Sequence, residues 1–150
     1  MRLKFILSVS FIILSYGFAD HLVVPGHLTD WNVLQESDVW VGWTIKDDIQ
    51  WCRAEKILPF EMEHISHIIE DKGNYPNVFK RIEDIAILAP DIVHISLDMP
   101  FPFSNRDYIV KYVSNKTDNE NIYTFTAYDE MKVPERKNYV RLINAGGRWT

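Results

Sequence analysis

The side chains that most often bind metals or act as nucleophiles are few in this sequence, and they lack the spacing that such sites need. His64 and His67 are three residues apart with Asp71 beyond them, so a helix would bring them to one side. The four-residue His-x-x-x-His spacing of helical zinc sites, with its catalytic glutamate, is absent. Cys52 is the only cysteine and has no flanking basic cluster, so we expect a buried, inert thiol. We therefore expect no metal site, no cofactor and no intrachain disulfide.

A paired acid and base is the second kind of chemistry to consider. His94 and Asp98 lie on the same side of a predicted strand, but the extended chain between them holds them too far apart to touch. Arg106 and Asp107 are neighbours that point to opposite faces of a strand, so we expect each to form an ion pair elsewhere. This favours a protein that is not an enzyme. An enzyme with acid/base chemistry is the alternative.

Alternating apolar residues indicate instead a surface for an apolar ligand. Two strand-like segments each turn one apolar face to the same side, and Phe125 in a third segment belongs to the set, although its own pattern does not settle its face. Arg141 could bind the polar end of a ligand as a fixed cation or form an exposed salt bridge. The alternative for the tyrosines is an ordinary sheet core. The candidate cavity-lining residues are Val93, Ile95, Leu97, Tyr108, Val110, Tyr112, Phe125 and Arg141.

The elements that would position these residues are strands grouped around one helix. Period-two alternation predicts strands over residues 31–35, 39–45 and 49–58, and later over residues 82–88, 92–99, 106–114, 121–129 and 139–144. Between the two groups, Met62, Ile65 and Ile69 recur at helical spacing and predict a helix over residues 60–72, followed by an irregular connection over residues 74–79. This order predicts an α+β domain with an antiparallel sheet.

Composition limits the partners of this domain. With 47% hydrophobic and 25% charged residues in 150, the chain has the profile of one globular domain. Its 16 basic and 21 acidic side chains give a net charge of -5, which argues against a nucleic-acid partner and disfavours stable attachment to an anionic membrane. Aromatic residues make up 13% of the chain, which suits a large apolar interior.

The first nineteen residues have the layout of a secretory signal peptide. Arg2 and Lys4 form a basic start, residues 5–18 are almost uncharged and apolar, and Gly17 and Ala19 are small. The apolar run is shorter than the roughly 20 residues of a membrane-spanning helix, so we expect cleavage after Ala19, with a retained anchor as the alternative. We expect a linker over residues 20–30, a domain over residues 31–150, and a secreted or periplasmic protein.

From residue 31 onward the chain resembles the START (steroidogenic acute regulatory protein-related lipid transfer) family of the helix-grip superfamily. The most specific match is Pro-Phe-Ser-Asn-Arg-Asp-Tyr at residues 102–108, which is similar to the family's proline loop and Arg-Asp-aromatic strand start. Further matches are Trp-Asn-Val-Leu at 31–34, Asp-Val-Trp-Val at 38–41, the helix at 65–71, the connection at 75–79, Val-Pro at 133–134 and Tyr-Val-Arg at 139–141.

The resemblance implies a curved antiparallel sheet that grips a long C-terminal helix and binds a lipid or other apolar small molecule between them. Family domains continue beyond residues 146–150 through a final strand and that closing helix, so this sequence resembles an incomplete domain. An uncovered apolar sheet face would then allow transient membrane contact or association with another chain. The alternatives are a cyclase-like or hydrolase-like helix-grip enzyme and a partial domain without independent function.

Overall fold

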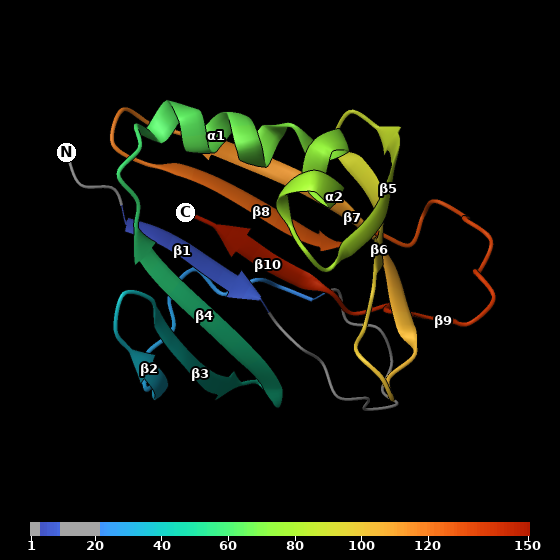
Figure 1. Cartoon of the computed structure of the whole chain (residues 1–150), viewed down its shortest axis with the longest axis horizontal. Helices are drawn as coiled ribbons and strands as arrows, with labels where there is room; N and C mark the ends of the chain where they lie inside the picture. Colours follow the sequence, from blue (N-terminus) through green and yellow to red (C-terminus); the bar gives the residue numbers. More distant parts are fainter. Residues whose placement is uncertain (1–3, 10–21) are drawn as a thin grey trace.

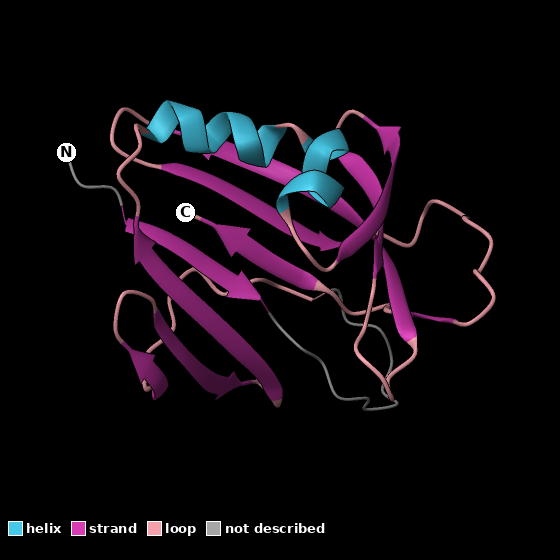
Figure 2. Cartoon of the chain, in the orientation of Figure 1, coloured by secondary structure: helices cyan, strands magenta, loops and turns pink. Residues whose placement is uncertain are grey.

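The structure, a computed structural model, describes residues 4–9 and 22–150. In this part of the chain one sheet carries every strand, and the helices pack on one of its faces (Figure 1 and Figure 2). The strands are β1 (Lys4–Val9), β2 (Asn32–Glu36), β3 (Trp40–Lys46), β4 (Ile49–Ile57), β5 (Ile82–Ala89), β6 (Ile92–Leu97), β7 (Asn105–Lys116), β8 (Asn121–Ala127), β9 (Tyr139–Arg141) and β10 (Gly146–Trp149). The helices are α1 (Met62–Glu70), the 3-10 helix η1 (Lys72–Asn74) and α2 (Tyr75–Val78).

The strands are ordered β2-β3-β4-β1-β10-β8-β7-β6-β5, and all these neighbours are antiparallel. Only β9 is parallel, where it pairs with β7. The β3–β4 hairpin turns at Asp47 and Asp48, whose positive φ values of 54° and 58° fit a tight two-residue turn. The predicted α+β class with a large antiparallel sheet is confirmed.

Helix α1 occupies the centre of the predicted helical segment. Ile69 on its buried side is only 2% exposed, whereas Ile68 beside it is 41% exposed, as expected for an amphipathic helix on a sheet. The connection predicted as irregular forms η1 and α2, and Pro76 lies in the first turn of α2, where a missing backbone N–H costs no hydrogen bond.

We call the sheet face that contacts α1 and α2 the inner face, and the opposite face the outer face. Tyr75 of α2 packs with the buried residues Val93 and Val110 of the sheet in one apolar cluster. Under α1, Ile69 packs with Tyr123 of β8 and Trp149 of β10. The core of the domain therefore lies between the two helices and the neighbouring strands β6, β7, β8 and β10.

The segment before β2 differs from a free linker. Residues 22–30 contain no helix or strand and lie against the outer face, where Arg148 of β10 donates a hydrogen bond to the Gly26 carbonyl. Residues 4–9, within the predicted signal peptide, form β1 between β4 and β10. The remainder of that peptide and its cleavage position after Ala19 fall outside the described residues. Among the described helices, none has the length and apolar character to cross a membrane.

Candidate functional site

Seven of the eight candidate lining residues lie together on the inner face. Val93, Ile95, Val110 and Tyr112 are buried in the cluster under α2, with relative exposures of 0%, 2%, 0% and 8%. Leu97, Tyr108 and Phe125 are partly buried and pack against that cluster. Because Phe125 is directly opposite the inward-facing Tyr112 in the β7–β8 pairing, its face is settled by the register. The strand alternation thus identified one continuous apolar surface.

Tyrosine hydroxyl groups supply the polar atoms of this surface. Tyr75 of α2 donates a hydrogen bond of 2.5 Å to the carbonyl of Ile69. Burial raises the pKa of Tyr75 and of Tyr108 to about 12, and it raises the pKa of Tyr112 well above its usual value. These phenols therefore stay neutral at physiological pH, and they can orient a ligand by hydrogen bonding but not by charge.

Arg141 does not join the inner-face set, which corrects its assignment to the cavity lining. The strand expected over residues 139–144 ends at Arg141 and pairs in parallel with β7, which places Arg141 beside Asp107 on the outer face. Its Nε and Nη2 atoms lie 3.0 and 2.7 Å from the two Asp107 carboxylate oxygens. This guanidinium is committed to a structural ion pair of the kind expected for Asp107.

His94 contacts the same carboxylate, a pairing that the sequence analysis missed. Its Nε2 lies 2.7 Å from Oδ2 of Asp107, and the two residues are 8% and 1% exposed. In the β6–β7 hairpin, His94 is opposite Ile109, and so it is diagonal to Asp107 on the same face. A predicted hairpin between these two strands with its midpoint between Phe101 and Pro102 would have given this pairing and so this contact. The resulting acid and base pair faces away from the apolar surface.

Strands β4 and β3 also carry side chains on the inner face, beyond the part that the helices cover. Ala54 shares a register row with Leu7 and Trp149, so its side chain is on the inner face. Cys52 lies on the same side of β4 and is a free thiol whose pKa is raised by burial. Val41 and Trp43 of β3 are directly opposite Ala54 and Cys52. All four side chains are half-buried, so part of their surface is accessible.

Several solved structures are similar to this chain. A STAR-related lipid transfer protein from Xanthomonas axonopodis superposes with a TM-score of 0.65 at 15% identity, over 79% of this chain and 78% of that chain. Human STARD10 also gives a TM-score of 0.65 at 15% identity, over 87% of this chain and 68% of that chain. Neither a protein family nor a curated protein sequence matches the chain. The chain has a START-like helix-grip fold.

Proposed function

We propose that this protein binds a lipid or another apolar ligand on the inner face of its sheet and transfers that ligand between membranes. The observation that carries the proposal is that β3 and β4 present half-buried apolar side chains on the same sheet face as the cluster under α2. The START-like fold supports it, because the similar protein from Xanthomonas axonopodis is a lipid transfer protein.

Only an apolar surface can compete with a bilayer for such a ligand. Each methylene group moved out of water gains about 0.8 kcal/mol, so an eighteen-carbon chain needs an environment that supplies on the order of 14 kcal/mol. The accessible parts of Val41, Trp43 and Ala54 would contact the chain, and the hydroxyls of Tyr108 and Tyr112 would orient its polar end.

The proposed role involves no catalysis. Among the described residues, His94 and Asp107 come closest to an acid and base pair, and both lie on the outer face. Arg141 already occupies both oxygens of the Asp107 carboxylate. A ligand on the inner face would therefore contact neutral phenols and apolar groups, which can bind it but do not move protons in the physiological range.

The loop between β6 and β7 suits brief contact with a membrane. Phe101 and Phe103 are 97% and 60% exposed on a segment stiffened by Pro100 and Pro102. Exposed aromatic side chains of this kind can insert into the interfacial region of a bilayer. Because the chain carries a net charge of -5, we expect the contact to be local and transient.

Ligand binding is tested by solvent extraction of the purified full chain, followed by mass spectrometry and titration with a fluorescent fatty acid. Ala54→Trp adds a bulky ring to the inner face and should weaken binding about tenfold or more. Val113→Trp is the control, since Val113 is 63% exposed on the outer side of β7. Folded protein that yields no lipid from any expression host, or equal effects of both variants, would contradict the proposal.

Transfer is tested separately from binding. Phe101→Ser should slow lipid exchange between donor and acceptor vesicles by about tenfold while leaving affinity for a fluorescent fatty acid unchanged. Phe60→Ser is the matched control, because Phe60 is 58% exposed on the connection between β4 and α1. Equal exchange rates for Phe101→Ser and the unchanged protein would rule out this loop as the membrane contact.

We also propose that the protein is exported to a secreted or periplasmic location. The support is the basic start at Arg2 and Lys4, the apolar run that follows, and the small residue Ala19. Determination of the N-terminal residue of the exported protein tests the proposal. We expect a chain that begins at Asp20, and an intact Met1 in the exported protein would contradict cleavage.

A further inference from the structure

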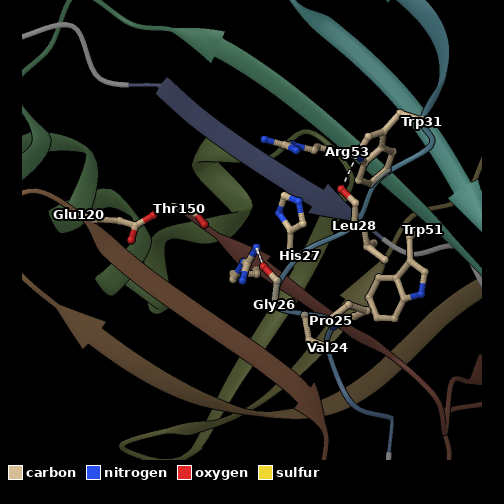
Figure 3. Close-up of a pocket in the computed structure, with 11 residues that line it drawn as sticks. Val24, Pro25, Gly26, His27, Leu28, Trp31, Trp51, Arg53, Glu120 and Thr150 are labelled. Atoms are coloured by element: carbon tan, nitrogen blue, oxygen red, sulfur yellow. Dashed lines mark hydrogen bonds between the residues drawn. The ribbon is translucent and has the colours of Figure 1, made fainter. Parts of the chain in front are cut away.

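A hollow of about 250 Å³ lies on the outer face, between residues 24–31 and the strands β4 and β10 (Figure 3). It is separated by the sheet from the apolar surface proposed to hold lipid. Its floor comes from Trp51 and Arg53 of β4 and from Arg148 of β10, and its cover comes from the segment that leads into β2. The lining residues are Val24, Pro25, Gly26, His27, Leu28, Trp31, Trp51, Arg53, Glu120, Arg148 and Thr150.

Specific contacts hold the covering segment in place. The absence of a side chain at Gly146 lets Leu22 approach β10, since a Cβ there would lie 2.8 Å from a Leu22 methyl group. Trp31 Nε1 donates a hydrogen bond of 3.0 Å to the Leu28 carbonyl. The Trp31 ring meets that of Trp40 edge to face, with centroids 5.9 Å apart. The hollow is therefore built by packing that is specific to this segment.

Among the ionisable side chains of the lining, basic ones outnumber acidic ones. The Arg53 guanidinium lies 5.8 and 6.0 Å from the ring centroids of Trp31 and Trp40, and it is paired with Glu55. Arg148 donates to the Gly26 carbonyl at 2.9 Å, and no acidic residue within residues 22–150 forms an ion pair with it. His27 adds a further basic group, and Glu120 is the one acidic side chain of the lining.

Polar atoms without partners lie around the same hollow. In the described part of the chain, Trp51 Nε1, Arg53 Nε and Thr150 Oγ1 are buried and make no hydrogen bond. Trp51 is only 2% exposed. A buried polar group without a partner costs roughly 1–3 kcal/mol, and both nitrogen atoms can only donate. Such a set of groups favours an occupant rich in hydrogen-bond acceptors.

We propose that this hollow binds a small soluble anion that carries a carboxylate or phosphate group. The guanidinium of Arg148 supplies the charge and a fork of donors that matches either group, and the indole rings of Trp31 and Trp51 give apolar walls. The volume has room for about eight groups the size of a water molecule, which suits a molecule as large as benzoate. The site is independent of the proposed lipid function.

The test is calorimetric titration of the full chain with inorganic phosphate and with sodium benzoate. We expect saturable binding of at least one, weakened about tenfold or more in Arg148→Gln and less in Arg148→Lys, which keeps the charge but not the fork. The control is Arg106→Gln, because Arg106 also bonds to backbone carbonyls but lies at the start of β7, opposite Leu97 on the inner face. We expect it to bind like the unchanged protein.

Three results would overturn the proposal: no saturable binding of either anion, equal losses in the Arg148 and Arg106 variants, or binding only to vesicles that contain phosphatidic acid. Circular dichroism of Arg148→Gln confirms that a loss of binding is not a loss of folding. Its content of extracted lipid should match that of the unchanged protein. Failure of the anion site is thus distinguishable from failure of the lipid site.

Discussion

At the scale of single residues, the Asp107 carboxylate links β7, β6 and β9 on the outer face. Burial alone would raise the pKa of Asp107, but hydrogen bonds from Arg141 and then from His94 outweigh it, so the pKa lies below its usual value. In the loop between β8 and β9, Arg136 donates a 2.6 Å hydrogen bond to the buried Ser96 hydroxyl of β6. Charge-assisted bonds in a nearly dry site are strong and costly to break.

Asp107→Asn should lower the free energy of unfolding at neutral pH by about 3 kcal/mol, because Arg141 and His94 are then buried without their anion. Asp98→Asn is the control, since the ion pair of Asp98 with Arg81 spans 3.8 Å at the surface and should contribute less than about 1 kcal/mol. Denaturant unfolding of both variants measures the difference. Similar small losses would show that Asp107 is not a structural link.

The same carboxylate predicts how stability depends on pH. Because the pKa of Asp107 is lower in the folded state than in the unfolded state, its contribution is complete above the ordinary aspartate pKa of about 3.9. It is lost as the pH falls through the lower, folded value. Denaturant unfolding at stepwise lower pH should therefore show a smaller acid loss in Asp107→Asn than in the unchanged protein. Parallel curves would contradict this.

At the scale of elements, the periodicity of apolar residues predicted the strands and the helix in which such residues recur regularly. Strands β2 to β8 begin and end within two residues of the predicted ranges, and α1 lies within its range, because apolar residues recur periodically along them. Strand β10 was not predicted, since Gly146 and Gly147 lack side chains that could show alternation. It forms because β8 and β1 flank it with backbone hydrogen bonds. Arg141 was wrongly predicted to line the cavity, because β9 is a short strand whose parallel pairing with β7 has no signal in the sequence.

The packing of α1 gives a matched pair of variants one residue apart. Ile69→Ala should lower the free energy of unfolding by about 3 kcal/mol, because Ile69 fills a buried contact with Tyr123 and Trp149. Ile68→Ala removes the same atoms from a side chain that is 41% exposed, and we expect less than about 1 kcal/mol. Denaturant unfolding compares them, and equal losses would mean that α1 does not pack as described.

At the scale of the whole molecule, the sequence predicted the class of fold but not the strand order. The resemblance of residues 102–108 and of the other matched segments to the START family agrees with the two structural neighbours. The hollow on the outer face has no local signal, because Gly26, Arg53 and Arg148 come together only through long-range pairing. Likewise, no periodicity showed that residues 4–9 lie between β4 and β10.

Strand β1 predicts what loss of the N-terminal segment would do. A chain that begins at Asp20 leaves the facing edges of β4 and β10 without the backbone partners they have in β1. We expect a lower midpoint of denaturant unfolding and concentration-dependent association in sedimentation. Removal of residues 1–3 alone is the control, since it keeps β1. A stable, monomeric chain from Asp20 onward would show that β1 is dispensable.

In the uncleaved chain, the position of β1 also divides the sheet into two groups of strands. Among the described pairings, β1 is the only bridge between β2–β4 on one side and the strands that carry α1 and α2 on the other. Elements joined in this way can open as separate cooperative units. Backbone amides of residues 32–57 should therefore exchange with deuterium as one block, sooner than those of β6 and β7. The two groups of strands would then separate transiently next to β1.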